Sequence, residues 1–212
     1  KRNMLRPGNQ HCYFGLDFTY DVIPNRLVPY DYAAFDRWSG VAEAVVTDIE
    51  TGKAAYFPVD KQDKQFVLLR ATCAMPLLFP IFDYQGIKCL DGGVADAIPW
   101  KRALEMGCER VVVVLTRERG YHKKPEHLMG LMRAVYHRYP RFLDVMARRA
   151  DLYERSRAEL FDAERQGKVL VYAPESTQGF SRTERDVVKI HALWQQGLDH
   201  ARERADETIA YL

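Results

Sequence analysis

The fold is decided by residues 86–115, which read GIKCLDGGVADAIPWKRALEMGCERVVVVL. Residues 86–90 are a short apolar run that predicts a strand, and residues 101–106 predict a helix that ends at Gly107. Residues 110–115 are apolar on both faces, as in a central parallel strand that is buried under helices. Strand, helix and strand in this order predict a βαβ unit, and hence an α/β fold in which helices cover the sheet.

The loop Asp91-Gly92-Gly93 within this stretch is the main candidate for chemistry. Asp91 ends a predicted strand, and open α/β sheets bind their ligands at the carboxyl ends of strands. The two glycines allow positive φ and the close approach of a second backbone. A carboxylate in this place can accept a proton from a hydroxyl group or orient a base. The alternative is a tight turn in which Asp91 only binds backbone N–H groups and Asp96 opens the next helix.

The region before this stretch is rich in aromatic residues and turn formers. Pro24 is expected to stop the first helix, because proline disfavours helix in the residue before it. Asp31 is expected to cap the second helix. The predicted elements are helices over residues 17–23, 31–38 and 65–73, and a hairpin of strands over residues 41–48 and 53–59.

The region after residue 126 changes to a helical pattern. Gly167 is expected to end the longest helix, and Ser181-Arg182-Thr183-Glu184 has the form of a capping box at the start of the last one. His191 lies on the apolar stripe of that last helix, so a partly buried imidazole is expected. The predicted elements are helices over residues 128–139 and 141–165, a strand over residues 168–172 and a final helix after residue 184.

The composition is that of a globular protein. Apolar residues make up 47% of the chain and charged residues 28%, which argues against disorder. A net charge of +2, with no recognisable DNA or RNA module, argues against a nucleic-acid partner. The longest apolar run has strand length and is too short to span a bilayer. Widely spaced cysteines predict reduced, mostly buried thiols and a cytoplasmic protein; they are Cys12, Cys73, Cys89 and Cys108.

Two blocks of sequence carry a resemblance to a known family. Residues 70–80 (RATCAMPLLFP), followed by residues 90–99 (LDGGVADAIP), resemble the second signature block of patatin-like phospholipases. Together with residues 115–117 and 120–125, and with the tail over residues 180–197, they look like the bacterial cytoplasmic subgroup that has a small helical C-terminal extension. The resemblance covers most of the chain.

The resemblance implies a serine–aspartate dyad acyl hydrolase on a three-layer α/β/α fold. Asp91 would be the general base, in a loop supported by Gly92 and Gly93, and it would activate a serine on a G-x-S-x-G elbow. A carboxylate is a weak base unless it is desolvated next to the hydroxyl, and backbone donors would stabilise the tetrahedral intermediate. This chemistry needs no metal and no organic cofactor. Residues 1–165 would be part of the acyl hydrolase domain, and residues 166–212 would be the extension.

The sequence departs from the family pattern at the nucleophile. Its serines are Ser39, Ser156, Ser176 and Ser181, and none of them lies in a G-x-S-x-G motif. A G-G-G run for an oxyanion loop is also missing from the sequence. In the family, both elements precede the region that this chain resembles. We therefore expect a C-terminal part of a longer protein, which supplies Asp91 but no nucleophile and is inactive alone.

The basic stretch after residue 116 is a second candidate site. Arg117, Lys123 and Lys124 are candidates to bind the anionic head group of a lipid or ester substrate, with peripheral membrane contact, although charge runs are usually solvated faces. His122 and His127 lack an acidic partner at helical spacing, so no metal site is predicted. A non-catalytic lipid-binding module and an acyltransferase stay open as alternatives, and the sequence does not fix the oligomeric state.

Overall fold

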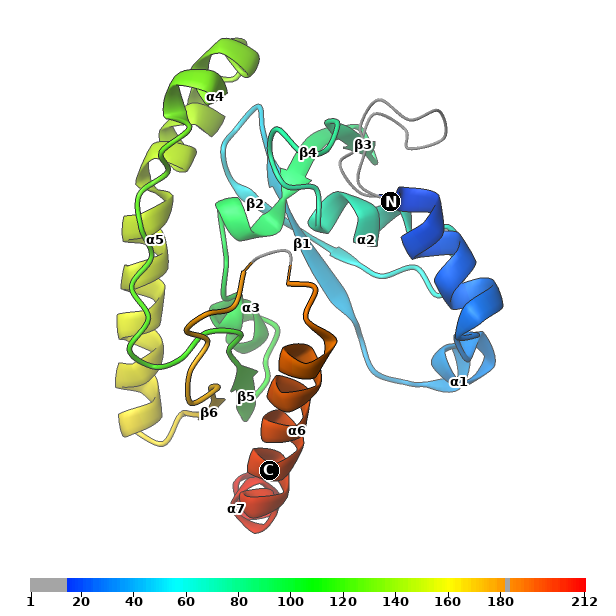
Figure 1. Cartoon of the computed structure of the whole chain (residues 1–212), viewed down its shortest axis with the longest axis vertical. Coiled ribbons are helices and arrows are strands. Elements are labelled where there is room, and N and C mark those ends of the chain that lie inside the picture. Colours follow the sequence, from blue (N-terminus) through cyan, green and yellow to red (C-terminus); the bar gives the residue numbers. More distant parts are fainter. Residues whose placement is uncertain (1–14, 182–183) are drawn as a thin grey trace. The chain divides into compact units, whose positions relative to one another are not determined.

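The structure, a computed structural model, describes residues 15–181 and 184–212 and contains both helices and strands. The predicted mixed α/β class is confirmed (Figure 1). The chain divides into two units: the first comprises Lys1–Ala97 and Lys124–Leu152, and the second comprises Ile98–Lys123 and Tyr153–Leu212. The predicted division at residue 166 into a hydrolase domain and an extension stays a prediction.

The first unit contains an antiparallel sheet of four strands in the order β2-β1-β4-β3. The predicted hairpin over residues 41–59 is confirmed, and its turn contains Gly52 at a φ of 70°. The strand β4 pairs with β1 on one side and with β3 on the other. The strands are β1 (Glu43–Asp48), β2 (Ala54–Pro58), β3 (Phe82–Tyr84) and β4 (Ile87–Asp91).

The first unit also contains short helices. Asp31 caps α1 as predicted, because its Oδ1 accepts the Ala34 N–H at 2.8 Å. The first helix is a π-helix that contains Pro24, so its predicted end before Pro24 is wrong. No residue of this helix is buried, so water can bond the carbonyl oxygen that lacks the proline N–H. The helices are η1 (Phe18–Leu27), α1 (Tyr32–Arg37), α2 (Val67–Thr72), η2 (Gly92–Val94) and α4 (Met129–Val135).

The strand β4 is covered on both faces. Successive side chains of a strand point to opposite faces, and Cys89 and Leu90 are both 0% exposed. Cys89 packs in a cluster with Val46 and Leu68, whereas Leu90 packs in a cluster with Phe142 from the helix α5 (Pro140–Arg165). Asp91, the last residue of β4, therefore directly follows two buried residues, although Lys88 earlier in the strand is exposed.

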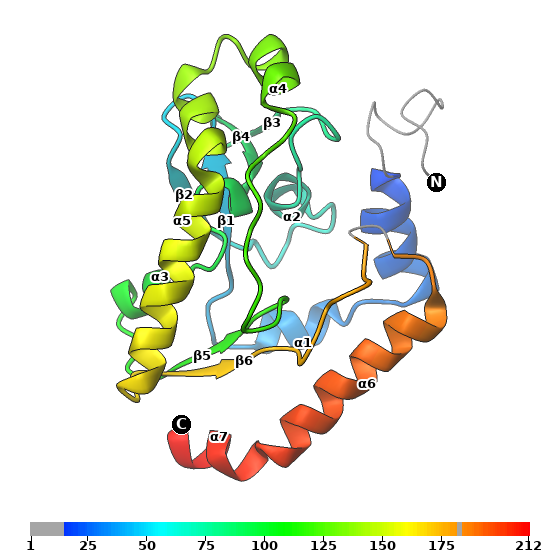
Figure 2. The same cartoon turned by 60° about the vertical axis from the view of Figure 1, so that its left-hand side comes forward.

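The second unit contains a parallel pair of strands, which lie side by side in Figure 2. The predicted helix over residues 101–106 is confirmed, and Gly107 follows it at a φ of 90°. The helix α5 contributes its residues from Tyr153 onward and ends before Gly167, as predicted. The elements are α3 (Trp100–Glu105), β5 (Val111–Val114), β6 (Val169–Tyr172), α6 (Val187–Glu203) and α7 (Ala205–Tyr211).

The predicted βαβ unit is wrong, because β4 and β5 lie in different sheets. Both edges of β4 are occupied by antiparallel neighbours, and β5 pairs with β6. The predicted burial of β5 on both faces is also wrong. Val111 and Val113 are buried in a core with Leu160, whereas Val114 on the other face is 73% exposed.

The start of α6 differs from the prediction. Asp186 is its N-cap and accepts the N–H groups of Val188 and Lys189 at 3.0 and 3.3 Å, so the predicted cap at Ser181 is wrong. Residues 182–183 of the predicted capping box lie outside the described residues. The expected partial burial of His191 is wrong as well: the residue is exposed, and its ring lies 5.4 Å from that of Trp194.

Within the described ranges, no helix has the length and hydropathy to cross a bilayer.

Candidate functional site

Asp91 lies where the sequence predicts it, at the carboxyl end of a strand and at the start of a tight loop. Its backbone N–H donates to Ala74 O at 2.9 Å, and its carbonyl oxygen accepts the hydroxyl of Thr47 at 2.8 Å. Its carboxylate oxygen Oδ1 accepts the Gly93 N–H at 2.7 Å, which makes Asp91 the N-cap of η2. The residue is half-buried, and its main chain is fixed on both sides.

Thr47 holds the two ends of this loop together. Its side chain is 0% exposed and extends from the central strand β1. The hydroxyl donates to Asp91 O, and its oxygen accepts the Ala95 N–H at 3.1 Å. One buried hydroxyl thus fixes the first residue of the loop and the residue that closes η2.

The two glycines of the loop have different roles. A Cβ at Gly92 would lie 2.1 Å from Val45 O, so the backbone of β1 comes too close for any side chain. A Cβ at Gly93 would lie 3.1 Å from Asp91 Oδ1 and 4.0 Å from the Arg149 guanidinium. The predicted close approach of a second backbone is confirmed at Gly92. Positive φ is found at neither glycine, so that part of the prediction is wrong.

The two sequence blocks that carry the family resemblance meet at Asp91. The bond from Asp91 N–H to Ala74 O joins the loop to the middle of residues 70–80. Thr72, in the same block, donates its hydroxyl to Val45 O on β1. Leu77 adopts a φ of 67°, which is uncommon for a branched residue, and its N–H donates to the hydroxyl of Tyr136 at 2.9 Å. Hydrogen bonds thus fix this segment beside the carboxylate.

Cys73 interacts with Asp91, and Tyr20 is hydrogen-bonded to Cys73. Cys73 is exposed, yet desolvation by neighbouring atoms raises the pKa of its thiol and the negative charge of Asp91 raises it further. Desolvation also raises the pKa of Tyr20, whose hydroxyl donates to Leu69 O at 3.2 Å. No sequence pattern marks Tyr20 or Thr47, because their positions depend on contacts between distant segments.

Arg149 and Asp96 make two further hydrogen bonds at or next to the loop of Asp91. Arg149 on α5 donates its Nε–H to Gly93 O at 3.1 Å, so a positive charge stands beside the loop. Asp96 accepts the hydroxyl of Tyr56 at 2.6 Å, which is a structural role. Among residues 15–181 and 184–212, no group of three or more histidine, cysteine or acidic side chains is arranged to hold a metal ion.

The basic loop belongs mainly to the second unit, which contains Arg117 and Lys123, whereas Lys124 belongs to the first. The guanidinium of Arg117 lies 5.0 Å from the Tyr121 ring and donates to Thr177 Oγ1 at 3.0 Å. The ammonium of Lys123 lies 4.6 Å from the ring of Tyr153. The structure therefore brings Arg117 and Lys123 to one aromatic pair, because the two tyrosine rings are 6.0 Å apart. Lys124 is exposed.

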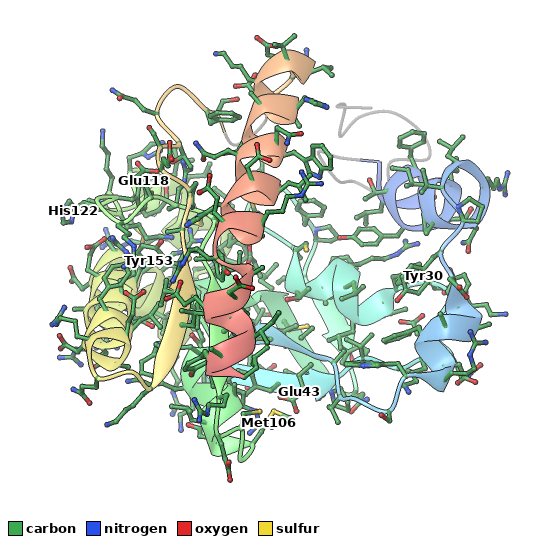
Figure 3. All side chains as sticks on the ribbon, turned by 90° about the horizontal axis from the view of Figure 1, so that it is seen from below. Tyr30, Glu43, Met106, Glu118, His122 and Tyr153 are labelled. Atoms are coloured by element: carbon green, nitrogen blue, oxygen red, sulfur yellow. The ribbon has the colours of Figure 1, made fainter. Side chains whose placement is uncertain are left out.

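The backbone of this loop is held by two charged residues of α5. Arg157 is 5% exposed and donates to the carbonyl oxygens of Arg119 and Tyr121. Glu154 accepts the Lys123 N–H at 2.7 Å and lies 3.0 Å from His122 Nδ1. Partial burial acts to raise the pKa of Glu154, but these hydrogen bonds lower it overall. Tyr153 and His122 are labelled in Figure 3. These hydrogen bonds join the loop backbone to α5.

Comparison with known proteins gives one family match. A domain of unknown function, DUF6363, matches residues 139–212. The matched region begins just before α5 and also includes β6, α6 and α7. No curated protein matches the chain. The chain is thus similar to DUF6363 over its C-terminal third, a domain whose description assigns no activity.

Proposed function

We propose that this chain is the aspartate-bearing part of a carboxylic ester hydrolase that acts on lipids, with a three-layer patatin-like fold. One observation carries the proposal: the hydrogen bond from Asp91 N–H to Ala74 O, which joins the two blocks that resemble patatin-like phospholipases. The half-buried position of Asp91 at the end of β4, directly after the buried Cys89 and Leu90, supports it. The free thiols of Cys73, Cys89 and Cys108 support a cytoplasmic location.

In the proposed mechanism, Asp91 accepts the proton of a serine hydroxyl while the serine oxygen attacks the ester carbonyl. A carboxylate has about four lone-pair sites, so the bond from Gly93 N–H leaves capacity for the serine hydroxyl. None of the serines in these 212 residues lies in a G-x-S-x-G motif, so the proposal requires a serine that another segment would supply. Asp91 then returns the proton to the leaving alcohol, and the cycle repeats with water on the acyl-enzyme.

One observation favours a second candidate, a non-catalytic lipid-binding module. Asp91 caps η2 through the Gly93 N–H, and a capping aspartate has a structural role even without chemistry. The two candidates differ in what the negative charge of Asp91 does. In the hydrolase it is the base, whereas in the binding module only the capping oxygen matters.

The replacement Asp91→Asn separates these two roles, because asparagine caps helices about as well as aspartate but cannot act as a base. The test uses the longest form of the protein that its coding region specifies, with a short-chain p-nitrophenyl ester as substrate. Asp91→Asn should lower kcat by about 10²–10⁴-fold and leave the thermal midpoint nearly unchanged. Asp96→Asn is the matched control, because the Asp96 carboxylate accepts the Tyr56 hydroxyl in a structural role, and it should retain most activity.

The outcome decides between the candidates. Equal kcat in wild type and Asp91→Asn would remove Asp91 from the mechanism. Binding of lipid vesicles without ester turnover in any form would favour the binding module.

We also propose that the exposed Lys124 contributes to contact with anionic lipid, together with Arg117 and Lys123. Lys124→Glu should then weaken binding to vesicles that contain phosphatidylglycerol.

A further inference from the structure

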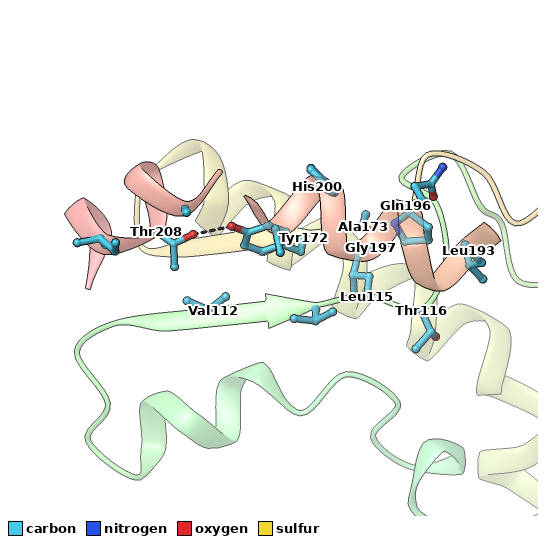
Figure 4. A pocket seen from close by; sticks show the side chains of 15 residues that line it. Val112, Leu115, Thr116, Tyr172, Ala173, Leu193, Gln196, Gly197, His200 and Thr208 are labelled. Atoms are coloured by element: carbon cyan, nitrogen blue, oxygen red, sulfur yellow. Dashed lines mark hydrogen bonds between the residues drawn. The ribbon is translucent and has the colours of Figure 1, made fainter. Parts of the chain in front are cut away.

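The second unit contains a pocket of about 650 Å³ between its strands and its last two helices. Volumes of about 300–1,000 Å³ are typical of small-molecule sites. Figure 4 shows Val112 and Leu115 on the strand side and Gln196, Gly197 and His200 on the helix side. All residues that line the pocket belong to the second unit, so it is separate from the loop of Asp91.

The pocket explains why one face of β5 is not packed in the core. Val111 and Val113 are buried, but Val112 and Val114, which point the other way, line the pocket. The helix side is apolar as well. The apolar lining residues are Val112, Val114, Leu115, Ala173, Pro174, Leu193, Ala201, Ala205 and Ile209.

The helices are fixed to the strands at one end of the pocket. The Tyr172 hydroxyl is hydrogen-bonded to Thr208 Oγ1 on α7, as the dashed line in Figure 4 marks. The hydroxyl of Tyr211 donates to Lys168 O at 2.8 Å, and Arg204 donates to Val171 O at 2.8 Å. These bonds hold α7 against β6, so the pocket is part of a folded unit.

The side chains that line the pocket indicate which class of ligand it can bind. No aspartate, glutamate, lysine or arginine is among the described residues that line the pocket. Glu175 outside the lining accepts the amide N–H of Gln196, and the guanidinium of Arg204 is paired with Glu207. An ion in this pocket would lose hydration without gaining a counter-ion, which is unfavourable. Thr116 and His200 supply hydrogen-bonding groups beside the apolar surface.

We propose that this pocket binds an uncharged single-chain amphiphile, a long-chain alcohol or its ester. The chain packs against the apolar face of Val112 and Val114, and the hydroxyl or ester oxygen bonds Thr116 or His200. The proposal does not depend on ester hydrolysis at Asp91, because the two sites share no residue.

The test is a series of NMR titrations of the 212-residue chain with 1-octanol, 1-nonanol and 1-decanol. Each added methylene should tighten the Kd by about fourfold, because the pocket buries it. Decanoate and decylammonium should each bind at least about tenfold more weakly than 1-decanol, because no lysine, arginine, aspartate or glutamate is among the described lining residues. Equal or tighter binding of either ion would overturn the proposal, as would the absence of binding by any alcohol.

A pair of variants places the binding in this pocket. Gly197→Leu fills the pocket from α6: a Cβ at Gly197 meets no atom within 4 Å, and replacing a helical glycine removes a helix penalty of about 1 kcal/mol. Ala192→Leu, on the same helix outside the pocket, is the control. Gly197→Leu should weaken 1-decanol binding at least tenfold, with Ala192→Leu unchanged.

Three results would overturn the assignment. The first is unchanged binding in folded Gly197→Leu. The second is loss of 1-decanol binding in the longest form of the protein, which would mean that another segment of the same protein occupies the pocket. The third is loss of binding as protein concentration rises, which would make it an interface between copies.

Discussion

Replacing Thr47 by valine tests how firmly the loop of Asp91 is held. The change keeps the shape of a side chain that is 0% exposed and removes its hydroxyl. Asp91 O then loses a donor at 2.8 Å. The Ala95 N–H loses one of two acceptors, because it also bonds Gly92 O at 3.1 Å.

The expected destabilisation of the loop follows from the loss of these two hydrogen bonds. A buried group left without its partner costs about 1–3 kcal/mol, and the shared Ala95 bond adds only a fraction because one acceptor stays. We expect Thr47→Val to destabilise the loop by about 1–3 kcal/mol. That corresponds to a change of about 5- to 150-fold in the equilibrium for local opening.

The assay is amide hydrogen exchange at Asp91 and Ala95, followed by NMR under conditions in which exchange reports the opening equilibrium. Their protection factors should fall by about 5- to 150-fold in Thr47→Val. Thr51→Val is the control, because the Thr51 hydroxyl bonds Asp48 at 2.7 Å in an exposed turn. It should leave the loop unchanged. Protection at both amides within twofold of wild type in Thr47→Val would refute the reasoning.

Three more predictions follow from the structure. Gly92→Ala should destabilise the chain by about 1–3 kcal/mol in urea unfolding because of the 2.1 Å contact with β1, whereas Gly93→Ala should have a clearly smaller effect. Burial raises the pKa of Cys89 to about 11, so iodoacetamide at pH 8 should label the exposed Cys108 and spare Cys89, as mass spectrometry of the peptides would show. Three backbone N–H groups lower the pKa of Glu184 from 4.5 to about 2. Its stabilising contribution is therefore present above pH 4.5 and lost as the pH falls towards 2, and the Glu184 carboxyl carbon shift should titrate near 2.

Local patterns predicted those elements whose signals lie close together in the sequence. Asp31 lies three residues before the amide that it caps, and Gly107 and Gly167 are each the second residue after the helix that they end. The position of Asp91 at the end of a strand also follows from its neighbours, because Cys89 and Leu90 are apolar and two glycines come next. Such features need no knowledge of distant partners.

Features that depend on distant pairing could not be predicted. Nothing near β4 in the sequence shows that β1 takes one of its edges, so the βαβ prediction failed. The role of Thr47 depends on the register that pairs Val46 with Asp91. Four consecutive valines in β5 hide the difference between its two faces, because the buried Val113 and the exposed Val114 have the same side chain.

The capping of α6 shows a different limit. Ser181 and Glu184 match the spacing of a capping box, but Asp186 lies nearer to the first helical turn and accepts two of its N–H groups. Several residues able to cap a helix stand close together here, and spacing alone does not show which one accepts the first N–H groups of the helix.

The central claim is that Asp91 withdraws the proton of a serine hydroxyl, and the rate of phosphonylation by a fluorophosphonate tests it most directly. In the longest form of the protein, the label should attach to a serine other than the four in these 212 residues, and Asp91→Asn should slow labelling by about 10²-fold or more. Equal labelling rates in wild type and Asp91→Asn, or a label on Ser39, Ser156, Ser176 or Ser181, would contradict the claim.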